Sequence, residues 1–128
     1  MPDAGGCAHV CVVDDDARVR RALASLLEAA DHRCRLFDSG AALLAWPRLD
    51  EFDLAIFDVT LPDLDGFALQ ARVAVAHPGL PFFFMSGSGA PGLAVRARRA
   101  GASAFFPKPL DPELLLATIE RVLNQRER

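Results

Sequence analysis

Cysteine, excess charge of one sign and long apolar runs are all scarce in this chain of 128 residues. Its three cysteines, Cys7, Cys11 and Cys34, are odd in number and lack metal-ligand spacing, which argues against a disulfide framework or a zinc site. The net charge of −3 does not favour nucleic acid or an anionic membrane surface as a direct partner. No signal peptide and no run of about 18 apolar residues is recognised. We therefore expect a reduced, cytoplasmic protein in which Cys11 and Cys34 are small buried side chains.

Apolar residues are plentiful but occur in short blocks. They make up 52% of the chain, and the mean hydropathy is +0.20. These values favour strands buried on both faces over a sheet with one exposed face. The length fits one domain with a sizeable core. Because no repeat or linker interrupts the sequence, we expect a single domain over residues 1–128 with its core at about 9–123.

Apolar runs and helical patterns alternate along the chain. Strands are expected at residues 9–13, 34–37, 54–57, 81–85 and 104–106. Helices are expected at residues 17–30, 40–46, 67–76, 93–100 and from residue 112 onward. Each helix joins two strands, so the strands pair in parallel, and right-handed crossovers place helices on both faces. The sequence therefore predicts an α/β, doubly wound, flavodoxin-like domain whose five-stranded sheet has the order 2-1-3-4-5.

Acidic residues end two strands that are neighbours in this order. Asp14, Asp15 and Asp16 follow the first strand, and Asp58 follows the third, about 5 Å away. Helix capping explains one or two of these acids. Gathering several carboxylates costs about 4 kcal/mol per pair at about 4 Å unless a cation offsets the repulsion. An oxygen-only cluster suits Mg²⁺, so we predict a magnesium site, with Asp16 left as the helix cap.

Four motifs at the strand ends carry a resemblance to a known family. They are VVDDD (12–16), FDVTLPDLDGF (57–67), FFFMSG (82–87) and FFPKPL (105–110). In this order and spacing, over nearly the whole chain, they resemble the receiver domain of bacterial two-component response regulators. The resemblance implies the following site residues: Asp14 and Asp15 as the acidic pair for Mg²⁺, Asp58 as phosphoacceptor and third carboxylate ligand, the backbone carbonyl of Thr60 as a further ligand, Ser86 as the switch hydroxyl, and Lys108 as the invariant-type lysine. It also implies a cis Lys108–Pro109 bond.

These residue types suit the formation of an aspartyl phosphate. A carboxylate can attack phosphorus when a metal and a lysine neutralise the phosphoryl oxygens and hold the groups in line. Asp58 would be the nucleophile, Lys108 a point charge and Ser86 a hydrogen-bond donor. Seen alone, Lys108 reads as a solvated loop residue and Ser86 as a turn residue, and only their joint placement favours the site. The resulting hypothesis is a signalling switch that assists its own phosphorylation and dephosphorylation, not a metabolic enzyme.

Two functions of other classes are alternatives. Residues 87–92, GSGAPG, match a dinucleotide-binding pattern, with Asp111 downstream as a ribose acid. That fingerprint belongs to the first strand of a nucleotide-binding fold, whereas here it follows the fourth. The other alternative is an aspartate-nucleophile phosphohydrolase, which needs a second acid two residues after Asp58. Thr60 occupies that position, so turnover of external phosphomonoesters is not expected.

The resemblance also implies a route by which the signal leaves the site. Phosphorylation would draw the Ser86 hydroxyl inward, and an aromatic residue three positions before the lysine, here Phe105, would swing into the vacated space. This chain has no tyrosine, so the ring lacks a hydroxyl. Side chains alternate along a strand, so the adjacent Phe106 competes with Phe105 for the buried face. The alternative is therefore that Phe105 is an ordinary core residue without a switch role. The responding surface would be formed by residues 93–100, residues 104–106 and the last helix.

The resemblance also implies partners. They are a sensor histidine kinase as phosphodonor and an output domain or downstream protein, with a homodimer through the same face as a further arrangement. Arg96, Arg98 and Arg99 supply a basic stretch there, although three arginines on one helix more often form a solvated face. We expect neither nucleic acid nor a membrane to bind this domain directly.

Overall fold

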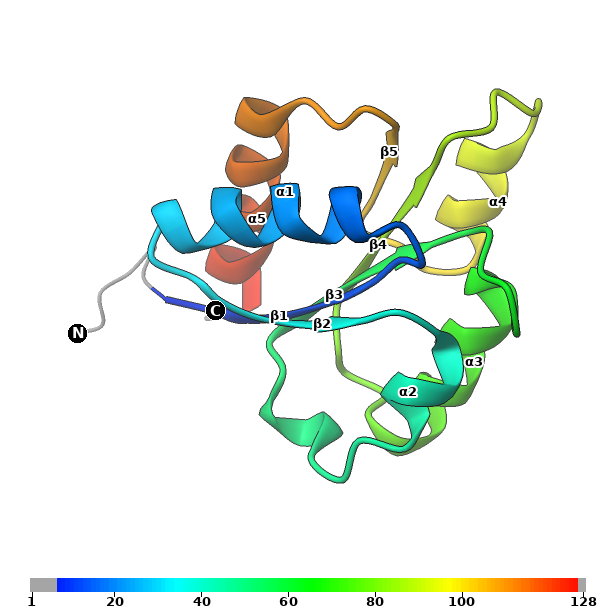
Figure 1. Ribbon diagram of the computed structural model, residues 1–128, viewed down its shortest axis with the longest axis horizontal. Coiled ribbons are helices and arrows are strands. Elements are labelled where there is room, and N and C mark those ends of the chain that lie inside the picture. The colour runs from blue at the N-terminus through cyan, green and yellow to red at the C-terminus, as the bar shows by residue number, and fades with distance from the viewer. Residues whose placement is uncertain (1–6, 127–128) are drawn as a thin grey trace.

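The computed structural model describes residues 7–126 as a five-stranded parallel sheet with the order β2-β1-β3-β4-β5 (Figure 1). This confirms the predicted fold and strand order. The expected glycine-containing start and the outer limits of the expected 1–128 domain, residues 1–6 and 127–128, lie outside the described residues.

The elements lie close to their predicted ranges. The strands are β1 (His9–Val13), β2 (Arg33–Phe37), β3 (Leu54–Asp58), β4 (Phe82–Ser86) and β5 (Ala104–Pro107). The helices are α1 (Ala17–Ala29), α2 (Gly40–Leu44), α3 (Gly66–Ala76), α4 (Leu93–Arg99) and α5 (Pro112–Arg126), with a 3₁₀ turn, η1 (Leu49–Glu51), that was not predicted. Because β3 and β4 both end one residue later than expected, Asp58 and Ser86 are the last residues of their strands rather than the first loop residues.

Helix α2 is shorter than predicted and ends at Leu44 instead of Trp46. Trp46 precedes Pro47, and a residue before proline is disfavoured in the helical conformation. The Trp46 indole N–H instead donates to Glu51 Oε2 at 2.7 Å, and its ring packs edge-on against Phe37. Trp46 therefore joins α2 to η1.

The sheet separates two hydrophobic cores. Helices α1 and α5 cover one face, and α2 and α3 cover the other (Figure 1). Side chains alternate along β4, so Phe82 and Phe84 face the α2–α3–α4 core while Phe83 and Met85 face the α1–α5 core. Strands β1, β3 and β4 are buried along their whole length, as parallel strands covered on both faces should be.

Side-chain oxygens cap the starts of three helices, among them the cap predicted at Asp16. Asp16 accepts from the Arg18 amide, Ser39 from the Ala42 amide, and Asp111 from the amides of Glu113 and Leu114. These bonds satisfy amides that a helix start otherwise leaves without partners. The start of each of these helices, α1, α2 and α5, is therefore set locally by sequence.

Two burial expectations need correction. Cys11 is buried, but Cys34 lies on the edge strand β2 and is only partly covered. In α1, only Leu23 and Leu27 are buried, and Ala22 is exposed although apolar residues recur at helical spacing at positions 19, 22, 23, 26, 27 and 30. The reason is a groove beside α1, lined by Val19, Ala22, Leu26, Pro109 and Leu110, that no other described element fills.

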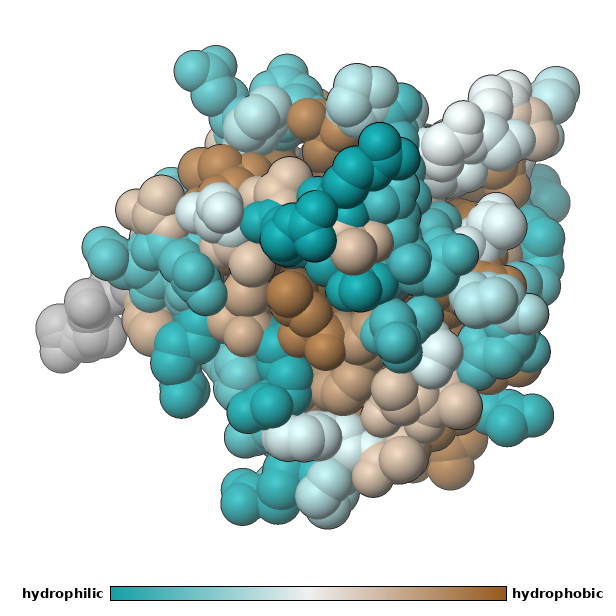
Figure 2. Space-filling view, in the orientation of Figure 1, coloured by the Kyte–Doolittle hydropathy of each residue, from teal (hydrophilic) through white to brown (hydrophobic). Residues whose placement is uncertain are grey.

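The outer surface is mixed in character. Hydrophilic side chains are interspersed with apolar ones over the face shown in Figure 2. Within residues 7–126, no helix combines the length and the apolar composition needed to cross a membrane.

Candidate functional site

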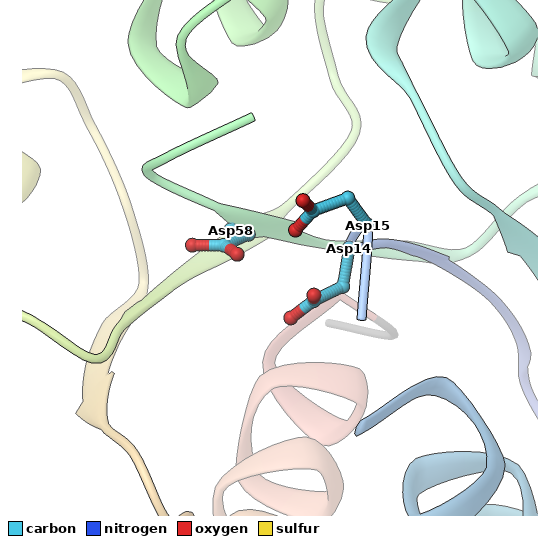
Figure 3. Close-up of side chains that lie close together, drawn as sticks. All are labelled: Asp14, Asp15 and Asp58. Atoms are coloured by element: carbon cyan, nitrogen blue, oxygen red, sulfur yellow. The ribbon is translucent and has the colours of Figure 1, made fainter. Parts of the chain in front are cut away.

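Three carboxylates meet at the carboxyl edge of the sheet. Asp14 and Asp15 follow β1, and Asp58 ends β3; the two strands pair in parallel with Val13 opposite Phe57. One oxygen from each carboxylate lies within 4.8 Å of one from each of the others. Figure 3 shows the three side chains turned toward a common space. The structure thus brings together the three acids that were predicted to share a cation.

Asp14 is the most constrained of the three, and its side chain is fully buried. Its backbone amide donates to the Phe37 carbonyl on β2, and its Oδ1 accepts from the Asp16 amide at 2.8 Å. Its backbone carbonyl accepts from the Arg20 guanidinium at 2.7 Å. Asp15, in contrast, is exposed and forms the open side of the cluster.

Lys108, the chain's one lysine, reaches the cluster from the loop after β5. Its Nζ lies 2.7 Å from Asp14 Oδ2 and donates to Asp58 Oδ2 at 3.0 Å. Burial lowers the pKa of Lys108, but the hydrogen bonds to Asp14 and Asp58 outweigh this, so the net pKa is raised and the ammonium stays charged. Its backbone amide donates to the Ser86 carbonyl at 2.8 Å, and the Lys108–Pro109 bond is cis, as the resemblance implied.

The charges at the site do not balance. Three carboxylates and one ammonium leave two negative charges when all are ionised. Burial is the main cause that raises the pKa of Asp58, and hydrogen bonds from the Thr60 amide and from Lys108 oppose it. A divalent cation would offset the remaining charge.

The loop from β3 to α3 is tied down at both ends. The Thr60 amide donates to Asp58 Oδ1 at 3.0 Å, and the Gly66 amide donates to the Val59 carbonyl at 2.8 Å. Farther along, Asp63 accepts from the Gly40 and Ala41 amides at the start of α2. The role of the Thr60 carbonyl as a metal ligand stays a prediction.

Sequence reasoning missed three residues that shape this site: Arg20, Asp63 and Gly66. Arg20 looks like any other arginine of an amphipathic helix, and Asp63 like a turn residue. Gly66 follows the α3 cap Asp65 and reads as an ordinary helix start. Their contacts join segments far apart in the sequence or need the exact course of the loop, so no local pattern signals them.

Gly66 leaves no room for a side chain. A Cβ at this position would lie 2.3 Å from the Asp58 carbonyl oxygen and 2.9 Å from Val59 Cα, both backbone atoms. We expect Gly66→Ala to lower the free energy of unfolding by about 3 kcal/mol, in the upper range for overpacking, and to displace Asp58. Urea denaturation measures the first effect. Gly79→Ala is the matched control, because nothing lies within 4 Å of its Cβ position, and a loss of stability equal to that control would contradict the prediction.

Ser86 and Phe105 lie on the same face of the sheet. Phe105 is opposite Phe84, and Ser86 is two residues beyond Phe84, so their side chains point the same way. Ser86 is buried and its Oγ accepts from the Ser88 amide at 3.0 Å. Phe105 packs against the α2–α3–α4 core, whereas Phe106 packs in the α1–α5 core against Phe83. The two phenylalanines therefore occupy opposite faces and do not compete.

The three arginines of the basic stretch of α4 are all exposed, as a solvated face would be, and two of them also make local contacts. The Arg96 guanidinium stacks over the Phe67 ring on α3 at 3.9 Å from its centroid. Arg98 lines a hollow of about 330 Å³ beside Phe105, and Ala97 is the helix's buried residue. Helix α4 is thus a short element with a small buried contact area next to Phe105.

Comparisons with known proteins agree with this geometry. A family model described as the response regulator receiver domain matches residues 10–120. The transcriptional regulatory protein FixJ of Bradyrhizobium diazoefficiens is 39% identical over 93% of this chain, and the DNA-binding transcriptional regulator NtrC of Rhizobium meliloti is 35% identical over 94%. The chain spans 58% of the former and 25% of the latter.

A solved structure of a CheY-like response regulator receiver domain protein from Methanospirillum hungatei superimposes with a TM-score of 0.85 at 27% identity. The match covers 95% of this chain and 98% of that one. With the family model spanning most of the sequence, and with acids and a lysine converging where the sheet of such a fold binds ligands, the chain belongs to the response regulator receiver domains, the phosphorelay signalling modules of two-component systems.

Proposed function

We propose that Asp58 accepts a phosphoryl group from a phosphohistidine of a sensor kinase, with Mg²⁺ held by Asp14, Asp15, Asp58 and the Thr60 carbonyl. The observation that carries the proposal is the convergence of three carboxylates and the chain's one lysine at a single point of the sheet edge. The modified domain then alters the face formed by α4, β5 and α5, to which an output domain or partner responds.

The donor set fits Mg²⁺. It consists of three carboxylates and one backbone carbonyl, includes no nitrogen or sulfur, and is open to water on the side of Asp15. When bound, the ion supplies positive charge that neutralises phosphoryl oxygens in the transition state. The two negative charges left at the site match this divalent ion in number.

The chain's own residues supply the rest of the reaction. An oxygen of Asp58 attacks phosphorus, the new O–P bond forms as the N–P bond of the phosphohistidine breaks, and the imidazole leaves. Lys108 keeps its proton and exchanges a carboxylate contact for a phosphoryl oxygen. Because Asp14 Oδ1 and the Asp14 backbone are already held by hydrogen bonds, the site needs little reorganisation.

The alternatives have less support. Thr60 stands where a phosphohydrolase needs its second acid, and its side chain cannot carry out that proton transfer. The GSGAPG segment lies in the exposed loop between β4 and α4, not after the first strand. We expect NAD to leave the thermal midpoint of the protein unchanged.

Labelling with a small phosphodonor such as acetyl phosphate tests the proposal. We expect one phosphoryl group per chain, dependent on Mg²⁺, in an acid-type linkage that hydroxylamine cleaves. Intact-mass spectrometry before and after hydroxylamine measures this. Label that forms without a divalent cation, or that survives hydroxylamine, would overturn the proposed chemistry.

The metal assignment predicts a clear loss of affinity when Asp15 is removed. We expect Asp15→Ala to weaken Mg²⁺ binding at least tenfold, because the ion keeps few protein ligands and loses one carboxylate. Titration followed by amide NMR shifts near residue 58 measures the affinity. Asp16→Asn is the control, since it removes an adjacent negative charge and keeps a helix cap. Unchanged affinity in Asp15→Ala would remove this residue from the site.

Ser86 is expected to carry the signal toward Phe105. Beryllofluoride, a phosphoryl mimic, should change amide shifts on α4, β5 and α5, because both residues move between two packings that the Ser86 hydrogen bond biases. Ser86→Ala should keep labelling of Asp58 but reduce these shift changes, since the hydroxyl contributes about 1 to 3 kcal/mol as a donor to a charged acceptor. Equal changes in wild type and Ser86→Ala would show that Ser86 does not carry the signal.

A further inference from the structure

We propose that Arg20 is a positioning residue that aims the Asp14–Asp15 pair at the cation. This inference rests on the proposed metal site. The observation is the hydrogen bond from Arg20 Nη1 of α1 to the backbone carbonyl of Asp14, 2.7 Å long.

The acceptor atom explains why this contact matters. The Asp14 carbonyl belongs to the peptide plane that joins Asp14 to Asp15. A peptide unit is rigid, so holding its oxygen restricts the torsions on both sides and with them the directions of both side chains. Asp14 has other anchors, at its amide, Oδ1 and Oδ2. Asp15 is exposed, so the orientation of its side chain depends chiefly on the backbone that Arg20 holds.

Charge adds to the positional effect. An arginine keeps its positive charge, and Arg20 directs that charge to the turn where the carboxylates gather. The repulsion between these carboxylates, about 4 kcal/mol per pair at about 4 Å, is thereby partly offset before any cation binds. A charge-assisted hydrogen bond of this length is also stronger than one between neutral groups.

Arg20 differs in this respect from the other arginines of α1. Arg18 is exposed and pairs with Asp16 at 3.5 Å on the outer side of the turn. Arg21 is exposed as well, whereas Arg20 is half-buried. Arg21 is therefore a matched control, one residue away on the same helix, with the same charge and without the contact to Asp14.

The experiment compares Arg20→Met, Arg20→Lys and Arg21→Met by Mg²⁺ titration. The amide shift of Asp15 is followed in each titration, and urea unfolding without metal is measured for each variant. We expect Mg²⁺ affinity to fall about tenfold or more in Arg20→Met, as is typical when a group that orients a metal ligand is lost. Arg20→Lys should recover part of this loss, because it keeps a donor and the charge. Arg21→Met should change affinity less than about twofold.

Phosphodonor labelling distinguishes positioning from chemistry. In Arg20→Met, raising Mg²⁺ to saturation should restore the labelling rate, since Asp58 and Lys108 are intact. Equal affinities in Arg20→Met and Arg21→Met would overturn the inference, as would a labelling defect that saturating Mg²⁺ leaves unchanged. If Arg20→Met does not fold, Arg20→Gln, which keeps a donor without the charge, takes its place under the same criteria. A wild-type domain that binds no Mg²⁺ would instead overturn the proposed function itself.

Discussion

Replacing Asp58 with asparagine is expected to abolish phosphoryl labelling of this domain. An amide oxygen is a far weaker nucleophile than a carboxylate, and within residues 7–126 no other carboxylate is placed against both Lys108 and the acidic pair. The variant should remain folded. Burial already raises the pKa of the Asp58 carboxyl, so a neutral group of the same size removes an unfavourable buried charge. Intact-mass spectrometry after incubation with acetyl phosphate and Mg²⁺ measures the loss.

The control for this variant lies in the same loop. Asp63→Asn removes a carboxylate five positions away that faces the start of α2 rather than Lys108, and it keeps an oxygen to accept from Gly40 or Ala41. It should label at the wild-type level. Label retained in Asp58→Asn would place the nucleophile on another residue, and loss of label in both variants would show that the loop conformation, not the Asp58 carboxylate, is the essential feature.

The sheet and the acidic cluster were predictable because both depend on simple periodicity. Alternating strands and helices require parallel pairing, and the strand order common to five-stranded sheets of this kind places β1 beside β3, so Asp14 and Asp58 meet without any knowledge of the loops. Reliance on periodicity also explains why α2 was predicted to extend to Trp46. Trp46 fits a helical pattern, but Pro47 disfavours the helical conformation there, and the indole N–H donates to Glu51 of η1 instead.

Contacts that depend on the detailed course of the turns and loops were beyond this reasoning. The Asp63 carboxylate contacts a helix start more than twenty residues away, and the Arg20 and Gly66 contacts depend on the exact course of the turns after β1 and β3. The face that Phe105 occupies was left open for a different reason. Because Phe105 and Phe106 are both phenylalanine, the sequence fits either assignment of the two side chains to the two faces of the sheet. The pairing of Phe105 with Phe84 in the structure decides which face each one occupies.

Lys108→Met is expected to destabilise the metal-free domain strongly. Asp14 and Asp58 are 0% and 6% exposed at their side chains, and both contact the Lys108 ammonium. Removing one partner of such a buried arrangement leaves uncompensated charge, which costs about 3 kcal/mol or more. Urea denaturation in the presence of a chelator measures the loss. Arg99→Met, which removes an exposed positive charge, is the control and should change stability by less than about 0.5 kcal/mol.

Two further readouts separate this charge effect from simple loss of packing. The pKa of Asp58 is raised in the folded state, so this carboxyl binds more protons in the folded domain than in the unfolded chain, and its own contribution to stability falls as pH rises above the ordinary range of an aspartate. Without the ammonium this dependence on pH should steepen. The loss of stability in Lys108→Met, relative to wild type, should therefore be smaller at about pH 5 than at about pH 8.

Mg²⁺ should also raise the urea midpoint of Lys108→Met more than that of wild type, because the ion would replace the only cation that contacted both acids within residues 7–126. A deficit that is independent of both pH and Mg²⁺ would mean that Lys108 stabilises the domain through its aliphatic chain and not through its charge.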